Sequence, residues 1–94
     1  MSAQEDDWKE LMKLITHIET PEKLSRFFDL FLTIEEKETL ASRFTIVKAL
    51  LKGKLTQRQI AEKCKVSISQ ITRGSNALKI IDKNLKKFIE TNLN

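Results

Sequence analysis

The chain has 94 residues, of which 40% are hydrophobic and 32% charged, a composition typical of a folded domain and not of a disordered segment or a membrane span. Its two Gly, one Pro and one Trp argue against a turn-rich β-sandwich or barrel. One Cys and one His exclude an internal disulfide and cannot supply the four ligands of a structural zinc site. We therefore expect a single all-α domain over residues 1–94.

Charge is distributed unevenly along the chain. Residues 1–22 hold six acidic side chains and two Lys, whereas residues 48–87 hold eleven Lys and Arg against two acidic side chains. Clustered positive charge favours a polyanionic partner, because nucleic acid releases condensed counterions when cationic side chains bind it. A solvated lysine-rich face is the alternative.

Apolar spacing and capping residues predict the first two helices. Residues at helical spacing predict a helix over about 4–18. They are Trp8, Leu11, Ile15 and Ile18. Thr20 before Pro21 is typical of the start of a second, short helix. That helix is apolar on several sides and needs covering by the same chain or by a second subunit.

A capping box, Thr33 with Glu36, predicts the start of the longest helix, and Gly53 is suited to its C-terminal end. Apolar residues recur along it at helical spacing up to Gly53. They are Leu40, Phe44, Val47 and Leu51. This helix is expected to form the spine of the fold.

Two further capping boxes, Thr56 to Gln59 and Ser67 to Gln70, predict helices over about 57–64 and 68–81. Two short helices with so brief a connection, in the most basic stretch, indicate a helix-turn-helix over about 56–81, whose second helix enters the DNA major groove. An ordinary helical hairpin is the alternative. The small core between the helices is expected to hold Ile60, Val66 and Ile71, with Ala61 allowing close approach.

At the turn, where many such motifs have Gly, this chain has Lys65. Asp82 or Asn84 is predicted to cap a last helix. The inner face of that helix would hold Leu85, Phe88 and Ile89.

The predicted reading helix presents hydroxyls, which suit base edges, and an aliphatic group, which suits a thymine methyl. The residues expected there are Ile68, Ser69, Gln70, Thr72 and Arg73. Other polar and basic residues are better placed for phosphates. They are Lys54, Gln57, Arg58, Lys63 and Lys65.

Several motifs resemble the bacterial tryptophan repressor family from about Leu30 to the C-terminus. They are Leu32-Thr33, Glu35-Glu36-Lys37-Glu38, Leu40-Ala41-Ser42-Arg43, Leu50-Leu51-Lys52-Gly53, Thr56-Gln57-Arg58, Ile71-Thr72-Arg73-Gly74-Ser75-Asn76 and Leu78-Lys79. The resemblance implies six helices per subunit, an intertwined homodimer, and binding to operator DNA when L-tryptophan is bound as corepressor. No other cofactor is implied.

The resemblance also implies the ligand residues. Arg43 and Arg73 match the two arginines that sandwich the indole ring, which suits planar guanidinium groups. The other matching positions are the carbonyls of Leu30 and Leu32, the Thr33 hydroxyl, Lys37, Gly74 and Ala77. Lys37 and Ala77 stand where the family has an arginine and a serine, and the missing serine hydroxyl near the ligand ammonium implies a lower tryptophan affinity. Gln70 and Ser69 on the reading helix and Ala61, where the family has a lysine, differ from the family at positions that the resemblance implies contact the operator.

Other function classes fit less well. His17 and Cys64 are far apart, and the chain has neither a Gly-rich phosphate loop nor a nucleophile motif, so we do not expect an enzyme. The charged N-terminal residues lack the apolar stretch of a signal peptide, which favours a cytoplasmic protein without membrane contact. A related DNA-binding regulator with another ligand or none, and a protein-binding helical module, remain alternatives.

Overall fold

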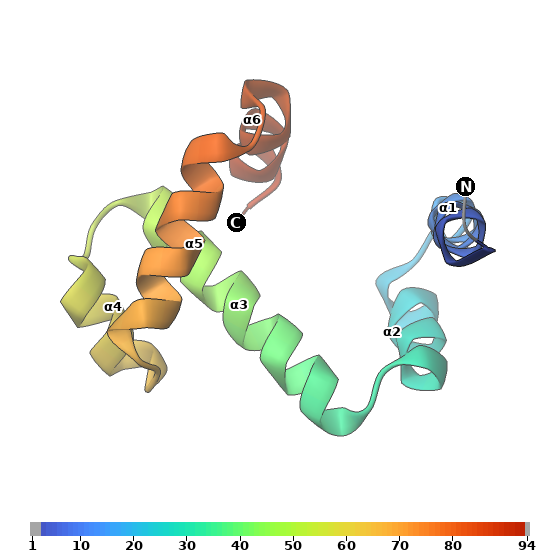
Figure 1. Cartoon of the computed structure of the whole chain (residues 1–94), viewed down its shortest axis with the longest axis horizontal. Helices are drawn as coiled ribbons and strands as arrows, with labels where there is room; N and C mark the ends of the chain where they lie inside the picture. Colours follow the sequence, from blue (N-terminus) through green and yellow to red (C-terminus); the bar gives the residue numbers. More distant parts are fainter. Residues whose placement is uncertain (1–2, 94) are drawn as a thin grey trace. The chain divides into compact units, whose positions relative to one another are not determined.

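The computed structural model describes residues 3–93, which form six α-helices and no strand (Figure 1). The helices are α1 (Ala3–Ile15), α2 (Pro21–Phe31), α3 (Ile34–Lys52), α4 (Gln57–Cys64), α5 (Ile68–Ile80) and α6 (Lys83–Asn92). The all-α fold and the number of helices predicted from the sequence are confirmed.

The contacts divide the chain into two compact units, one up to Lys37 and one from Glu38 onward. The division falls in the first turns of α3, and each unit is described below by itself. That the whole chain forms one domain stays a prediction.

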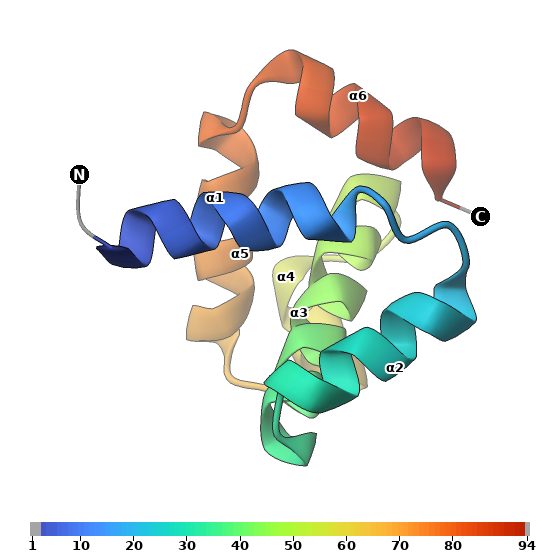
Figure 2. The same cartoon turned by 90° about the vertical axis from the view of Figure 1, so that its right-hand side faces the viewer.

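The first unit contains α1 and α2, joined by residues 16–20 (Figure 2). The predicted end of α1 at about residue 18 is wrong by three residues, because α1 ends at Ile15. The amide N–H groups of His17 and Ile18 donate to the carbonyls of Leu14 and Ile15, each at 3.0 Å and three residues back. The chain therefore tightens into turns where the apolar spacing still continues.

The predicted start of α2 is confirmed. The Thr20 hydroxyl accepts from the Lys23 amide at 3.2 Å, and Pro21 occupies the first turn. Further along α2, the Phe27 ring contacts the rings of Phe28 and Phe31 at centroid separations of 5.9 and 4.8 Å. Even so, no residue of α2 is buried, so its apolar sides are only partly covered within the described chain.

The capping box at the start of α3 is also confirmed. The Thr33 hydroxyl accepts from the Glu36 amide at 3.1 Å, and the Glu36 carboxylate accepts from the Thr33 amide at 2.9 Å. This reciprocal pair satisfies two backbone donors and fixes the corner between α2 and α3. At the other end of the helix Gly53 has φ 66°, as its position after the last turn requires.

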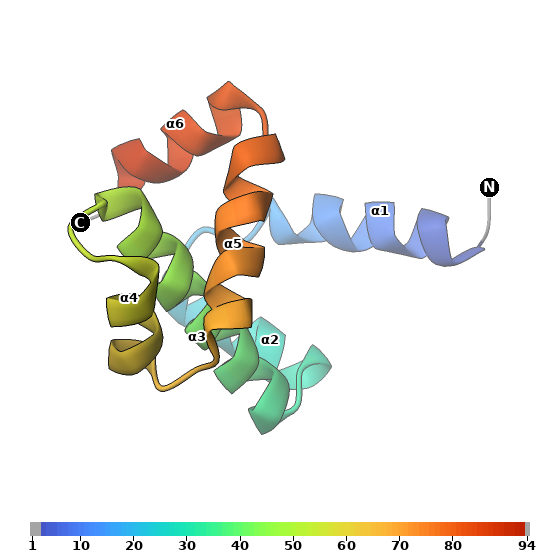
Figure 3. The same cartoon turned by 60° about the vertical axis from the view of Figure 1, so that its left-hand side comes forward.

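The core of the second unit lies where the later half of α3 meets α4 and α5 (Figures 1 and 3). The buried residues are Ile46, Ile60, Ala61 and Ile71, with Ala49, Leu50, Cys64 and Val66 packed around them. Ile60 and Ile71 are fully buried. The predicted contact between the two short helices through Ile60, Val66 and Ile71 is therefore confirmed.

The apolar residues whose spacing predicts α3 do not all lie on the side that it buries. Leu40 and Phe44 are each 51% exposed, whereas Ile46, on another face of the helix, is 3% exposed. α3 is apolar on two sides, and α4 and α5 pack on the side of Ile46 and Leu50. The Lys48 ammonium lies 5.6 Å from the centre of the Phe44 ring on the other side.

Asp82, and not Asn84, caps the last helix, because its carboxylate accepts from the Leu85 amide at 2.7 Å. The expected inner face of α6 is only partly covered, since Leu85 and Phe88 are exposed and Ile89 is half-buried in the described chain.

The turn between α4 and α5 places Lys65 in the left-handed region, with φ 56° and ψ 45°. Its amide and that of Val66 donate to carbonyls of the last turn of α4, which ends the helix. The left-handed conformation is sterically unfavourable for a residue with a Cβ, whereas Gly adopts it without that cost.

Lys65→Gly is therefore expected to raise the free energy of unfolding by about 0.5–1 kcal/mol, the relief of backbone strain less the greater entropy of the unfolded chain. Denaturant unfolding followed by circular dichroism measures this change. Lys63→Gly, inside α4, is the matched control and should lower stability by about 0.5–1 kcal/mol. Destabilisation by both variants would contradict the account of the turn.

Candidate nucleic-acid interface

The candidate interface is built on α4, a three-residue turn and α5, which have the form of a helix-turn-helix. The predicted capping box at the start of α4 is confirmed: the Thr56 hydroxyl accepts from the Gln59 amide at 3.1 Å, and the Gln59 side-chain oxygen accepts from the Thr56 amide at 2.8 Å. Gln59 is thus used in holding the helix end. The neighbouring Gln57 and Arg58 side chains are exposed.

The capping box predicted at the start of α5 is wrong. Ser67 is the N-cap residue, but its hydroxyl makes no capping bond. Instead it shares a hydrogen bond of 2.9 Å with the Ser69 hydroxyl. The Gln70 amide donates to the Ser67 carbonyl at 3.1 Å. A second hydroxyl two residues away competes for Ser67, which the capping pattern alone does not take into account.

The residues expected to face DNA are exposed with one exception. The exposed ones are Gln57, Arg58, Lys63, Lys65, Ile68, Ser69, Gln70, Thr72 and Arg73. Ala61 is the exception, because it is 9% exposed and belongs to the core with Ile60 and Ile71. Its small side chain allows α5 to pack closely on α4, and the expectation that it faces DNA does not fit its burial.

One contact between α4 and α5 was not expected from the sequence. The Thr72 hydroxyl on α5 donates to the side-chain oxygen of Gln57, the first residue of α4, over 3.2 Å. It also lies 3.1 Å from the Ile68 carbonyl one turn back. The two side chains are 15 residues apart, so no local spacing rule indicates their contact.

The expected ligand residues of the first unit surround the corner between α2 and α3. Leu30 is exposed, Leu32 is half-buried, and Thr33 takes part in the capping box. The Lys37 ammonium pairs with the Asp29 carboxylate at 2.5 Å, with both side chains about half exposed. Asp29 was missed at the sequence level because the pair spans the corner and follows no helical spacing.

The expected ligand residues of the second unit lie on α3 and α5. Gly74 allows the two helices to pack closely: a Cβ on it would meet the Ile46 Cγ2 atom at 3.3 Å and the Leu50 Cδ1 atom at 3.4 Å. Arg43 precedes Ile46 by one helical turn, and Arg73 directly precedes Gly74. Both arginines therefore lie close in sequence to the same helix contact, and both are exposed, as is Ala77.

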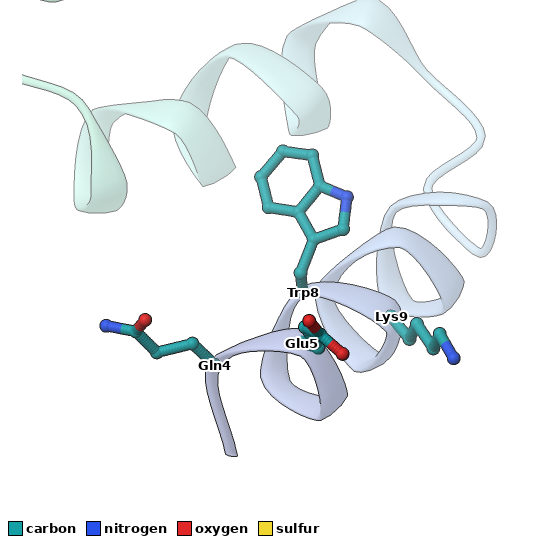
Figure 4. Close-up of a pocket in the computed structure, with 4 residues that line it drawn as sticks. All are labelled: Gln4, Glu5, Trp8 and Lys9. Atoms are coloured by element: carbon teal, nitrogen blue, oxygen red, sulfur yellow. The ribbon is translucent and has the colours of Figure 1, made fainter. Parts of the chain in front are cut away.

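One surface hollow lies away from these residues. A surface hollow of about 410 Å³ lies beside the exposed Trp8 indole, and all its lining residues come from two turns of α1 (Figure 4). The hollow therefore has a wall on one side only. Within residues 3–93, no group of three or more His, Cys, Asp or Glu side chains is placed to hold a metal ion.

No helix of the described chain is both long and apolar enough to span a bilayer.

Comparison with known proteins gives the family. The family model "Trp repressor protein" matches residues 6–93. A "Trp operon repressor homolog" of Chlamydia caviae is 55% identical over 92 residues, covering 98% of this chain and 90% of that protein. The protein of the same name from Chlamydia trachomatis serovar D is 46% identical and covers 95% of both chains. That of Vibrio vulnificus strain YJ016 is 42% identical and covers 85% of this chain and 80% of its own length. With nearly its whole length matched, the chain belongs to the Trp repressor family, which is a family of transcription regulators and not of enzymes.

Proposed function

We propose that this chain is a tryptophan-dependent transcriptional repressor. It acts as a homodimer that binds a near-palindromic operator in double-stranded DNA when L-tryptophan is bound as corepressor, and it controls genes of tryptophan biosynthesis or uptake. The observation that carries this proposal is the helix-turn-helix of α4 and α5, with its exposed basic and polar surface, in a chain of the Trp repressor family.

The DNA contacts divide into two kinds. The first turns of α5 read base edges, because Ile68, Ser69 and Thr72 are exposed at the end of the helix that such motifs insert into the major groove. Gln70 and Arg73 lie at the flank of this group. Phosphates are bound by the exposed polar and basic residues of α4 and the turn. These are Gln57, Arg58, Lys63 and Lys65.

Tryptophan binding depends first on Arg43 and Arg73. Their guanidinium groups are planar and permanently charged, so they stack on an indole ring and one of them pairs with the carboxylate. Gly74, which lets α3 and α5 pack closely, matches the family position that lines the indole. The resemblance to the family supplies the remaining ligand residues. These are the carbonyls of Leu30 and Leu32, the Thr33 hydroxyl, Lys37 and Ala77.

Dimerisation is supported by large apolar side chains that the chain leaves exposed. They include Trp8, Leu30, Phe31, Phe44 and Phe88. Monomeric soluble proteins rarely expose so much apolar surface, and among the described residues of the second unit only four are buried in its core. A second copy of the chain, intertwined with the first, is the partner that the family resemblance supplies.

Selection from a pool of random DNA duplexes, with and without L-tryptophan, tests the proposal. In the presence of L-tryptophan the protein should select sites with two half-sites related by two-fold symmetry, about one helical turn apart. The mass of the complex with such a site, measured by sedimentation, should correspond to two protein chains per DNA duplex. Selection of the same sites regardless of tryptophan would indicate a regulator with another ligand or none. Absence of any salt-dependent DNA binding would instead indicate a protein-binding module.

A further inference from the structure

An ion pair joins the last turn of α2 to the first turn of α3. The Lys37 ammonium lies 2.5 Å from the Asp29 carboxylate, and the two side chains are 44% and 55% exposed. The capping box of Thr33 with Glu36 also holds this corner, and an ion pair so exposed adds little stability. A role for the pair is therefore to be sought in ligand binding, because Lys37 is itself an expected ligand residue.

Asp29 is not placed to stabilise α2. It lies in the last turn of the helix, where the helix dipole is negative and disfavours a carboxylate. That turn contains no basic residue. Its carbonyl groups, that of Leu30 among them, have no acceptor role left inside the helix. The end of α2 thus gathers negative charge and hydrogen-bond acceptors, which suit an ammonium group.

The start of α3 offers the opposite chemistry. Lys37 carries a positive charge. The Thr33 hydroxyl accepts from the Glu36 amide at 3.1 Å, which uses a lone pair of the hydroxyl and leaves its hydrogen to donate. Both groups suit a carboxylate. The corner therefore presents groups for a cation and for an anion side by side, a pattern complementary to an amino-acid zwitterion.

The ion pair places Asp29 close to any carboxylate that Lys37 binds. A ligand oxygen about 3 Å from the Lys37 nitrogen lies no more than about 6 Å from the Asp29 oxygen, since both contact the same nitrogen. Two unit charges at that distance change an affinity about 3-fold in water and more at lower dielectric constant. Asp29 thus repels the ligand carboxylate and attracts an ammonium on the neighbouring carbon. An indole acid without the amine meets only the repulsion.

We propose that Asp29 is a specificity-determining residue, which makes the corepressor site favour an amino-acid zwitterion over an indole carboxylic acid that lacks the α-amine. Ala77 stands where the resemblance places a serine hydroxyl near the ligand ammonium, and the Asp29 charge attracts that ammonium in its place. This inference rests on the proposed function and extends it to a residue outside the expected ligand set.

The test uses the full chain and three ligands, measured by calorimetry or by competition: L-tryptophan, indole-3-propionate without the amine, and tryptamine without the carboxylate. Asp29→Asn keeps the side-chain size and an acceptor for Lys37 but removes the charge. It should raise the affinity for indole-3-propionate and lower that for tryptamine, each by about 3- to 10-fold. The affinity for L-tryptophan should change less, because the two effects oppose each other. The preference for L-tryptophan over indole-3-propionate should fall by about 3- to 10-fold.

Glu38→Gln is the matched control. It removes one negative charge from the exposed residue next to Lys37 in sequence, whereas the Lys37 ammonium pairs with Asp29. The preference between the two carboxylate ligands should stay that of the wild type. The helical circular dichroism signal of both variants should also match the wild type.

The outcomes are distinct. Weaker binding of all three ligands by one factor would show that Asp29 only holds the corner. Tighter binding of both carboxylate ligands by one factor, with tryptamine unchanged, would show that Asp29 only neutralises Lys37. Either result, or no change with any ligand, overturns the inference while the proposed function stands. A wild-type chain that binds none of the three ligands would overturn the proposed function and this inference with it.

Discussion

Ile71→Ala is expected to lower the free energy of unfolding by about 2–5 kcal/mol. Ile71 of α5 is fully buried in the core that α5 forms with α3 and α4, and among the described residues only three others are buried in that core. Loss of three carbon atoms from so small a core leaves a cavity that few neighbours can fill. Because the proposed protein is a dimer, unfolding should be compared at one protein concentration by circular dichroism in denaturant.

The chain offers a matched control on the same helix. Ile80 is 85% exposed at the end of α5, so Ile80→Ala removes the same atoms without opening a cavity in this core. Its effect should stay within about 0.5 kcal/mol. Equal losses from the two variants would show that the contact of α4 with α5 is not what stabilises the motif.

Helix starts could be predicted from the sequence where the bonding partners are three residues apart. Thr20, Thr33, Thr56 and Asp82 each cap the helix that their spacing predicts. Ser67 does not, because its hydroxyl bonds to the Ser69 hydroxyl and not to a backbone amide of α5. Local rules succeed when one partner is available and fail when two compete.

The covered face of α3 could not be predicted in the same way. Apolar residues follow two sides of this helix, and spacing alone gives equal weight to Leu40 with Phe44 and to Ile46 with Leu50. Only the position of α4 and α5 decides that Ile46 is buried. Periodicity identifies an amphipathic face and does not choose between two of them.

The candidate site shows the same limit. Exposed residues of the reading helix follow from helical spacing, and Lys65 in the left-handed region follows from its place in the turn. The contacts of Gln57 with Thr72 and of Asp29 with Lys37 join residues 15 and 8 positions apart across a turn or a corner. Such pairs depend on how two helices meet, which no short motif contains.

Arg73→Lys is expected to abolish most of the dependence of DNA binding on L-tryptophan. In the proposed function, the ligand stacks between Arg43 on α3 and Arg73 on the reading helix α5 and so restricts the orientations of that helix. DNA affinity should rise with ligand by the coupling free energy, typically about 1–3 kcal/mol or 5- to 150-fold. Lysine keeps the charge but lacks the planar fork that stacks on indole and pairs with a carboxylate.

Arg58→Lys is the matched control, because it makes the same change at an exposed residue of α4 that is expected to bind phosphate and not the ligand. It should weaken DNA binding modestly and leave the ratio of affinities with and without L-tryptophan unchanged. Titration of labelled operator with each protein, at fixed salt and with or without saturating L-tryptophan, gives that ratio directly.

Reciprocity makes the prediction stricter than a loss of binding. If tryptophan tightens operator binding by a given factor, operator must tighten tryptophan binding by the same factor, because both describe one coupling free energy. Calorimetry of L-tryptophan with the wild-type protein, free and bound to operator, should therefore reproduce the factor from the DNA titrations. In Arg73→Lys the effect of tryptophan on operator affinity and the effect of operator on tryptophan affinity should both fall toward a factor of 1. Sequence-specific DNA binding by the wild type that ignores tryptophan, with no heat of binding at millimolar ligand, would contradict the role of corepressor while leaving the helix-turn-helix as the DNA-binding element.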